Sequence, residues 1–207
     1  MSRDLTKTLL YHITDVSNLA LIVASGGLRS DVGLATVQHQ VIGYPNIKQR
    51  RMTQYRVPCC DNRFVGEFVP FYYCPRSPML FTVNKGNTGR PAGCQTDIVH
   101  LVSSVAAALK LDRPWAISDV NAGAGYATFS NNLEALETLD WNAIQTRQWQ
   151  GKMSAKQAEF LLLDQFEWSS IAMIGCHNAQ TADKVSATLK KLPGPHPQVV
   201  VENSWYY

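Results

Sequence analysis

Residues 157–163 (QAEFLLL) place a single carboxylate, that of Glu159, inside an otherwise apolar stretch, and we predict a β-strand here. Along a strand Glu159 shares one face with Leu161 and Leu163. Phe160 and Leu162 occupy the other face, so both faces are apolar. A buried carboxylate is costly unless it has a partner or a catalytic role. The alternative is a glutamate at a strand edge whose tip reaches solvent, and this stretch alone leaves both interpretations open.

Outward from this strand, turn and cap residues divide the chain into short elements. Residues 9–14 form a strand candidate, followed by N-cap residues and a short helix that ends at Gly26-Gly27. Further predicted strands cover residues 68–73, 80–83, 115–117, 171–176 and 198–202. Predicted helices cover residues 97–111, 133–144 and about 181–192. Residues 31–63 read as irregular, and residues 121–126 as a flexible glycine-rich loop.

This loose alternation of strands and helices predicts an α+β fold with a mostly antiparallel or split mixed sheet. The 207 residues contain no Pro/Gly/Ser-rich linker, so we expect a single domain over residues 1–207. Hydrophobic residues make up 45% and charged residues 17%, which excludes global disorder. We expect the C-terminal segment, residues 181–207, to dock onto its own sheet.

Charge, cysteine and motif content narrow the class of protein. The net charge of +3 is too small to identify a nucleic-acid partner by itself. No apolar run reaches the roughly 18 residues of a membrane span, and no secretory signal is present, so a cytoplasmic protein is expected. Five cysteines without a CxxC pair, and histidines without metal spacing, argue against disulfides and a metal site. Dinucleotide-binding GxGxxG, P-loop, HExxH and GxSxG motifs are absent.

Residues 31–63 are the most basic part of the chain, and aromatic residues lie among the cations. Arginine forks bind phosphates, and aromatic rings stack on unpaired bases, so this composition suits single-stranded nucleic acid. A solvated basic loop is the alternative. His12, between Tyr11 and Ile13 in the first predicted strand, is either a catalytic residue or, more often for such a position, a structural, hydrogen-bonded side chain.

Several motifs, in order, resemble the DarT toxins. The opening YHIT (residues 11–14), with Asn18-Leu19, Ile22 and Gly27-Leu28, is similar to the start of that family, and Arg50-Arg51 fits the following loop. Residues 69–80 (VPFYYCPRSPML) resemble its VPFYFxPRSPM signature. Residues 119–125 (DVNAGAG) and 139–141 (LDW) resemble its middle, and residues 156–161 (KQAEFL) resemble its RQAEFL strand, with Lys156 in place of arginine.

The resemblance covers roughly residues 10–175 and implies a compact ADP-ribosyltransferase fold whose split mixed β-sheet forms an NAD cleft. It implies a toxin that transfers ADP-ribose from NAD+ to thymine N3 in single-stranded DNA, releases nicotinamide and blocks replication. It also implies an antitoxin partner, DarG, whose macrodomain removes the mark. The PRSPM stretch favours thymine over guanine, the target of a close variant group. Transfer to RNA or protein, or a non-enzymatic single-strand-binding module, are the competing hypotheses. We expect a monomer.

By the same resemblance, Glu159 and Arg51 are the catalytic candidates. Glu159 would stabilise positive charge on the nicotinamide-side ribose. Arginine is essentially never deprotonated, so Arg51 is expected to stabilise developing negative charge and not to act as a base. The NAD contacts are expected among His12, Thr14, Asn18, Gly27, Leu28, Arg51, Tyr72 and Tyr73. The DNA contacts are expected among Lys48, Arg50, Tyr55, Arg56, Arg76 and Met79, with no metal ligand.

One detail of the expected site, the residue that stacks on nicotinamide, stays open. Either Tyr72 or Tyr73 stacks on nicotinamide, since adjacent strand residues face opposite ways. Residues 119–157 are expected to shape the acceptor pocket.

Overall fold

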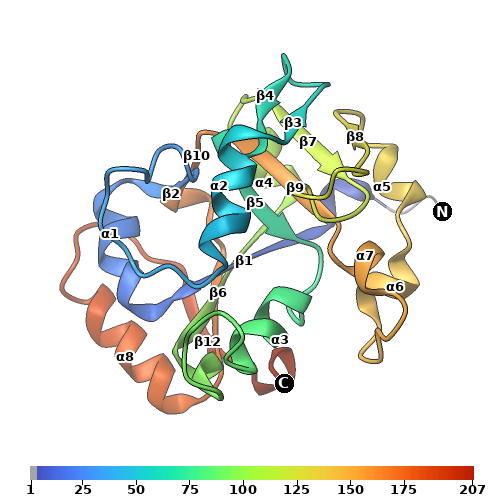
Figure 1. Cartoon of the computed structure of the whole chain (residues 1–207). Helices are drawn as coiled ribbons and strands as arrows, with labels where there is room; N and C mark the ends of the chain where they lie inside the picture. Colours follow the sequence, from blue (N-terminus) through green and yellow to red (C-terminus); the bar gives the residue numbers. More distant parts are fainter. Residues whose placement is uncertain (1–3) are drawn as a thin grey trace.

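An eight-stranded mixed sheet runs through the protein, which the computed structural model describes over residues 4–207 (Figure 1). Its strand order is β12-β11-β6-β1-β5-β9-β7-β8. Neighbouring strands are antiparallel except β11 and β12, which are parallel. The strands are β1 (Leu9–Asp15), β5 (Phe68–Tyr72), β6 (Ile98–Ser104), β7 (Trp115–Ser118), β8 (Phe129–Ser130), β9 (Glu159–Leu163), β11 (Met173–Cys176) and β12 (Gln198–Val201).

The sheet is split between β1 and β5. Along its length β1 pairs with β6, from Leu9↔Ser104 to Asp15↔Ile98, but it shares only the pair Tyr11↔Tyr72 with β5. Beyond that pair the two strands separate, and the His12 side chain bridges them through a 2.8 Å hydrogen bond to the carbonyl of Pro70. The structure therefore confirms the predicted α+β class and split mixed sheet.

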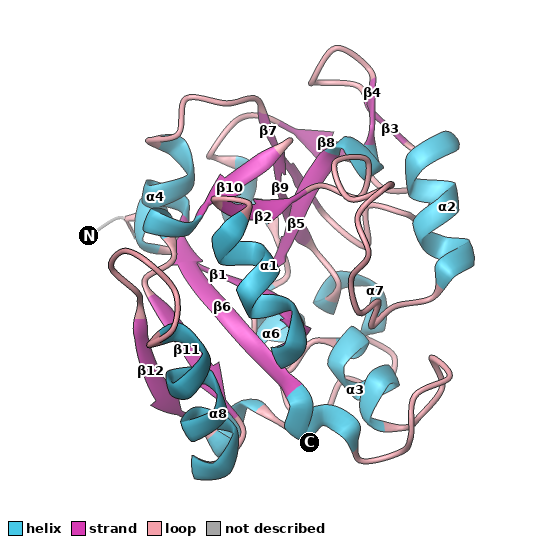
Figure 2. Cartoon of the chain, turned by 90° about the vertical axis from the view of Figure 1, so that its left-hand side faces the viewer, coloured by secondary structure: helices cyan, strands magenta, loops and turns pink. Residues whose placement is uncertain are grey.

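Two small ribbons, eight short α-helices and six single-turn 3-10 helices complete the fold of residues 4–207. The ribbons pair β2 (Gly27–Arg29) with β10 (Gln165–Glu167), and β3 (Arg56–Val57) with β4 (Arg63–Phe64). The helices are α1 (Leu19–Ala24), α2 (Pro45–Thr53), α3 (Pro78–Asn84), α4 (Val105–Leu109), α5 (Ala135–Thr138), α6 (Trp141–Gln145), α7 (Met153–Lys156) and α8 (Ala179–Leu189). Helices α2 and α3 lie on one side of the sheet, while α4 lies on the opposite side (Figure 2).

Apolar side chains from both halves of the sheet meet in one large core cluster. It includes Leu10 of β1, Leu101 of β6, and Phe71 and Phe160 of β5 and β9, all fully buried. The Phe71 and Phe166 rings lie 4.8 Å apart, so the β2–β10 ribbon is packed onto the same core. Strand β9 is thus covered on both faces, as its sequence predicts.

Two predicted elements are wrong because a short apolar run does not distinguish strand from helix. Residues 80–83, predicted as a strand, belong to helix α3. Ser77 caps that helix by accepting a hydrogen bond from the Leu80 amide, and Pro78 occupies its first turn. Residues 97–111, predicted as a helix, form the central strand β6 followed by the short α4. Strand β6 is buried on both faces, which hides the alternation of a strand.

Residues 31–63, predicted to be irregular, contain helix α2 and the β3–β4 hairpin. Arg51 is the only buried side chain of α2, so the helix has no apolar stripe for sequence reasoning to detect. The helix predicted over residues 133–144 is broken into α5 and α6. Asp140 begins the second one by accepting a hydrogen bond from the Ala143 amide.

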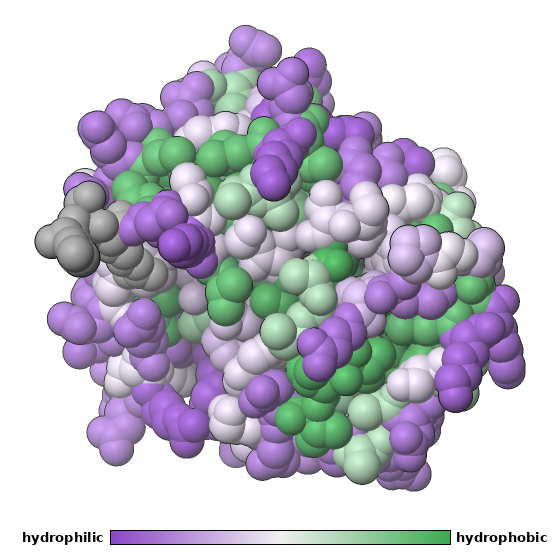
Figure 3. All heavy atoms as spheres, turned by 180° about the vertical axis from the view of Figure 1, so that it is seen from behind, coloured by the Kyte–Doolittle hydropathy of each residue, from purple (hydrophilic) through white to green (hydrophobic). Residues whose placement is uncertain are grey.

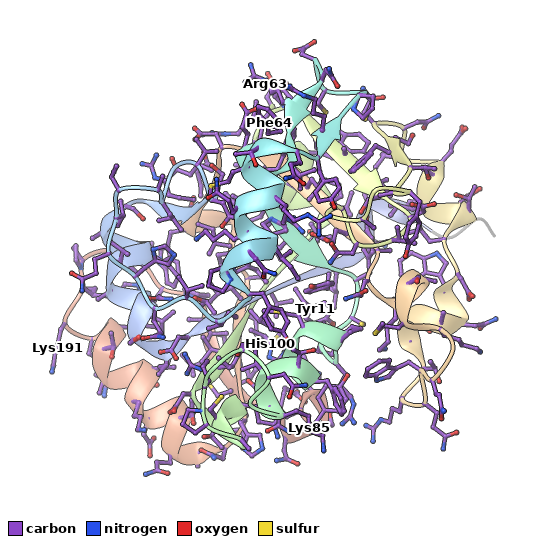
Figure 4. All side chains as sticks on the ribbon, viewed as in Figure 1. Tyr11, Arg63, Phe64, Lys85, His100 and Lys191 are labelled. Atoms are coloured by element: carbon purple, nitrogen blue, oxygen red, sulfur yellow. The ribbon has the colours of Figure 1, made fainter. Side chains whose placement is uncertain are left out.

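The C-terminal segment packs onto its own sheet, as predicted. The Tyr206 hydroxyl lies 2.9 Å from the carbonyl oxygen of Ile98 and 3.0 Å from that of Gly175, and the Trp205 ring lies against Gly175. His100 and Tyr11 lie beside this segment in the interior, where Figure 4 labels them.

The rear surface mixes hydrophilic and apolar residues (Figure 3). Across residues 4–207, no helix is long and apolar enough to cross a membrane.

Candidate active site

A cavity of about 300 Å³ opens where β1 and β5 separate. Its walls come from β1, β2, β5, β9, α2 and the loop of residues 31–44. Ten of the fifteen candidate catalytic, NAD-contact and DNA-contact residues line it: His12, Thr14, Asn18, Gly27, Leu28, Lys48, Arg51, Tyr72, Met79 and Glu159. The split of the sheet thus brings together positions that lie up to 147 residues apart, from His12 to Glu159.

Glu159 begins β9 and faces Tyr72 of β5 across the ladder, so both side chains lie on the cavity side. Its carboxylate is 1% exposed, which excludes a solvated strand-edge glutamate. Arg51 of α2 approaches it with both terminal nitrogens, at 3.1 Å to Oε1 and 2.9 Å to Oε2. A two-pronged contact of this kind fixes the plane of the carboxylate as well as its position.

Ala122 supplies a third hydrogen bond, which sequence reasoning missed. Its backbone amide donates to Glu159 Oε1 at 2.9 Å. The loop that carries it follows β7 and turns sharply at Asn121, whose Oδ1 accepts from the Gly123 amide at 2.8 Å. An asparagine two residues before a glycine is a turn signal that points to this loop, although not to Glu159.

The opposite charges of Arg51 and Glu159 stabilise each other. Burial disfavours the charged guanidinium of Arg51, but the adjacent Glu159 carboxylate outweighs burial and raises the pKa of Arg51. Burial and the same carboxylate raise the pKa of Tyr72, so its hydroxyl stays protonated at neutral pH. The site therefore combines a fixed carboxylate, a fixed cation and a neutral phenol.

His12 presents a hydrogen-bond acceptor to the cavity. Its Nδ1 carries the proton, because the Pro70 carbonyl opposite it only accepts. Burial lowers the pKa of His12 below its ordinary value of 6.5, so the ring is neutral at pH 7 and Nε2 has a free lone pair. A sugar hydroxyl is a suitable donor for this nitrogen.

Asn18 joins the base of the cavity to its covering loop. Its amide nitrogen donates to Thr14 Oγ1 and to the Gln40 carbonyl, and its Oδ1 accepts from the Gln40 amide at 2.8 Å. Asn18 thus holds the loop of residues 31–44 beside β1.

Gly27 and Leu28 form the wall contributed by β2. A Cβ atom on Gly27 would lie 2.1 Å from the carbonyl oxygen of Phe166, so no other residue fits this close approach of two strands. Leu28 is buried and belongs to the main core.

Lys48 also faces the cavity, where Asp31 and His39 hold it. Its Nζ lies 3.2 Å from Asp31 Oδ1 and 3.1 Å from His39 Nε2. Helix α2 is thereby tied to the loop of residues 31–44. Met79 lies at the same wall, near Gly43 of that loop.

Tyr72 lines the cavity and Tyr73 does not. Tyr73 is buried on the other side of the sheet against Trp141, with ring centroids 5.6 Å apart, and its hydroxyl donates to the Glu159 carbonyl at 3.3 Å. Lys156, just before β9, is also buried and donates to the carbonyls of Ile144 and Thr146. These contacts secure the backbone that precedes and includes Glu159.

The remaining candidates for DNA contact lie outside the cavity. Arg50, in the last turn of α2, contacts Tyr55, which follows the helix, and Arg56 lies over the Phe64 ring at 3.7 Å. Figure 4 shows Phe64 and Arg63 on the β3–β4 hairpin, away from Tyr11. Arg76 contacts the carbonyl of Tyr206 and lies over the Tyr207 ring, so the C-terminal segment engages it.

A metal centre is not part of this geometry: within residues 4–207, no three His, Cys, Asp or Glu side chains are grouped to hold an ion.

Comparisons with known proteins identify the family and support the fold. A family model described as "ssDNA thymidine ADP-ribosyltransferase, DarT" matches residues 11–207. A DNA ADP-ribosyl transferase of Thermus aquaticus is 38% identical over 201 residues, which cover 97% of this chain and 89% of the relative. The structure of Thermus sp. 2.9 DarT in complex with ADP-ribosylated ssDNA is similar with a TM-score of 0.91, at 35% identity over 97% of each chain. The same protein in complex with NAD+ is similar with a TM-score of 0.88, at 32% identity over 100% of each chain.

Proposed function

Because this chain belongs to the DarT family of ssDNA thymidine ADP-ribosyltransferases, we propose that it transfers ADP-ribose from NAD+ to thymine bases of single-stranded DNA. The bond between ribose C1′ and the nicotinamide nitrogen breaks, and the bonding electrons leave with nicotinamide. Thymine N3 releases its proton to solvent and bonds to C1′. The observation that carries the proposal is a buried glutamate, held by an arginine and a backbone amide, at the wall of the cavity in the split sheet.

Glu159 is the residue we assign to nicotinamide departure. Glycosidic cleavage places positive charge on the ribose ring, and a rigid carboxylate beside the ring stabilises that charge. Glu159 would also accept a hydrogen bond from the 2′-hydroxyl of the nicotinamide-side ribose. Its three hydrogen bonds keep it in place, so little reorganisation is needed as the charge develops.

Arg51 is assigned two tasks by its position. It orients Glu159 through two of its five N–H donors, and its remaining donors are available to the acceptor base or a phosphate of NAD+. Its raised pKa argues against a role as a proton acceptor. Arg51 would therefore stabilise the thymine anion once N3 has lost its proton.

The other cavity residues are assigned to NAD+. His12 Nε2 would accept from the adenosine-side ribose, and Tyr72 would stack on nicotinamide, because Tyr73 faces away from the cavity. Thr14, Asn18, Gly27 and Leu28 would form the remaining contacts. Single-stranded DNA would approach along the outer side of α2, where Arg50, Tyr55 and Arg56 offer charge and a stacking surface.

The biological setting belongs to the same proposal. Modification of unpaired thymines would block replication, so the protein would act as a toxin with an ADP-ribose-removing DarG antitoxin as its partner. A DNA substrate implies action in the cytoplasm. We further propose that residues 1–207 act as a single domain and as a monomer.

A thymine-containing oligonucleotide incubated with NAD+ and analysed by mass spectrometry tests this function. We expect product on single strands and little on duplexes. Label on guanine would move the chain to the variant group, and label on protein alone would overturn the DNA assignment. NAD+ binding without turnover would leave a binding module.

Glu159→Gln tests the catalytic residue in the same assay. It keeps the size of the side chain but loses the charge, so we expect product formation to fall by about 100-fold or more. Glu67→Gln is a matched control, because Glu67 also accepts from an arginine, Arg63 at 3.0 Å, and from a backbone amide, that of Phe64 at 2.7 Å. Wild-type activity in Glu159→Gln, with a normal melting temperature, would show that another carboxylate does this work.

A further inference from the structure

The loop between β7 and β8 surrounds Glu159 on two sides. Ser118, the last residue of β7, pairs with Glu159 in the sheet, and its hydroxyl accepts from the Glu159 amide at 3.2 Å. The same hydroxyl donates to the Val120 carbonyl at 2.7 Å. Four residues after Ser118, the Ala122 amide returns to the carboxylate at 2.9 Å. The backbone and the side chain of Glu159 are thus both bonded to one short turn.

Asn121 determines the shape of that turn. Its Oδ1 accepts from the Gly123 amide at 2.8 Å, and its backbone carbonyl accepts from the Ala124 amide at 2.9 Å. A Cβ atom at Gly123 would lie 3.0 Å from Asn121 Oδ1 and 3.4 Å from Arg51 Cγ, so the turn is packed closely against the arginine. Such an Asx-turn directs the intervening amide, here that of Ala122.

Ala122 is fully buried, and its methyl group belongs to a second apolar cluster with Val57, Phe68 and Leu161. The amide therefore projects from a part of the loop that is anchored in the core. Asp119 closes the loop further along by accepting from the Thr128 amide at 2.9 Å.

The distribution of donors distinguishes the two oxygens of Glu159. Oε1 accepts from Ala122 and from Arg51 Nη1, while Oε2 accepts from Arg51 Nη2. A carboxylate oxygen has two lone-pair directions, so Oε1 is saturated and Oε2 retains one. Only Oε2 is left to accept a further hydrogen bond from a ligand in the cavity.

We propose that Asn121 is a positioning residue: its turn holds the Ala122 amide on Oε1 and so turns Oε2 toward the ribose. This inference rests on the proposed function and deepens it. Asn121 itself lines the cavity, but we assign its effect to the Ala122 amide and Glu159 and not to contact with NAD+ or DNA. Loss of the turn would leave the ion pair with Arg51 in place but would remove the second donor from Oε1, so the carboxylate and the guanidinium could shift together away from the ribose.

Asn121→Ala removes the acceptor for Gly123 and tests the proposal. We expect kcat to fall by about 10- to 100-fold, the range that misplacement of a catalytic group produces, while KM for NAD+ changes by less than about twofold. Both nicotinamide release and transfer to the oligonucleotide should be measured. Nicotinamide release requires Glu159 whatever the acceptor is. If the DNA assignment is wrong, the wild type releases nicotinamide without labelling the oligonucleotide. If the role of Asn121 is wrong, Asn121→Ala releases nicotinamide at the wild-type rate.

Asn121→Asp and Asn121→Ser separate positioning from direct contact. Both keep an oxygen that accepts from the Gly123 amide, and both lose the amide donor; serine adds no charge. We expect at least one of them to restore kcat to within about fivefold of wild type. If both are as slow as Asn121→Ala, the side-chain amide contacts substrate and the proposal is wrong. An unimpaired Asn121→Ala enzyme would overturn it as well.

Asn178→Ala is the matched control. Asn178 Oδ1 accepts from the Thr181 amide at 2.9 Å at the start of α8, outside the cavity. This variant should lower the melting temperature through loss of a helix cap, and leave kcat unchanged. Asn121→Ala should show the opposite pattern, which a merely structural role would not produce.

Discussion

At the scale of single residues, the site depends on one buried ion pair. Arg51 is 8% exposed and Glu159 is 1% exposed. Removing either partner would leave an uncompensated buried charge, which typically costs about 3–5 kcal/mol. Substitutions in this pair are therefore expected to affect stability as well as activity, so folding and activity should both be measured for each variant.

Arg51→Lys preserves the charge but not the planar fork. A lysine ammonium cannot hold both oxygens of Glu159 in one plane, so we expect transfer to fall by about 100-fold, with NAD+ affinity reduced by less than about tenfold. Oligonucleotide labelling and titration calorimetry measure the two effects. Arg63→Lys, at the solvent-exposed pair with Glu67, is the control and should retain activity. A lysine variant that transfers at the wild-type rate would remove Arg51 from the mechanism.

At the scale of elements, the close contact of β2 with β10 forms one wall of the cavity. Gly27 has φ of +148°, and its Cα faces the Phe166 carbonyl so closely that a methyl group does not fit. The hydrogen-bonded register Phe166↔Leu28 then keeps Leu28 in the core. The packing of β2 against β10 by itself requires glycine at position 27, and the role of Gly27 in binding NAD stays a prediction.

Gly27→Ala should lower the free energy of unfolding by about 3 kcal/mol or more. The positive φ strains the alanine backbone, and the added methyl group overlaps the Phe166 carbonyl, so the two costs sum. Gly89→Ala is the matched control, with φ of +82° and no atom within 4 Å of the added Cβ. It should cost only about 1 kcal/mol, the cost of a left-handed backbone. Urea denaturation measures both. Equal losses in the two variants would show that the contact with Phe166 relaxes.

At the scale of the whole molecule, the C-terminal segment closes the interior next to His100. His100 is fully buried, donates from Nε2 to the Pro75 carbonyl at 2.9 Å, and has Nδ1 3.1 Å from the Tyr206 hydroxyl. Pro75 precedes the turn that leads into α3, so one imidazole joins the sheet, that turn and the end of the chain. Burial lowers the pKa of His100 from 6.5 to about 4.

This lowered pKa predicts a loss of stability in acid. The unfolded chain binds the proton more readily than the folded one, so acidification favours unfolding. The contribution of His100 is complete above pH 6.5 and is lost as the pH falls toward about 4, with a total on the order of 3 kcal/mol. Urea denaturation between pH 7 and pH 4 measures it, and His100→Gln should flatten the dependence. Parallel curves for the two proteins would contradict the prediction.

Elements with local signals are predictable from the chain alone. The apolar run around Glu159 predicted β9, and the N-cap and double glycine around α1 predicted its limits, because alternation, caps and glycines act over a few residues. Ordered motifs predicted the family and the cavity residues.

The contacts of Glu159 follow from the three-dimensional fold and not from local sequence. Arg51 lies 108 residues away on a helix without an apolar stripe, and the Ala122 amide is a backbone group that any residue except proline carries. The fold also makes residues 98–104 a strand and residues 78–84 a helix. A short apolar run is compatible with either a strand or a helix. Burial on both faces and pairing with neighbouring strands determine which of them forms, and a local pattern does not contain this information.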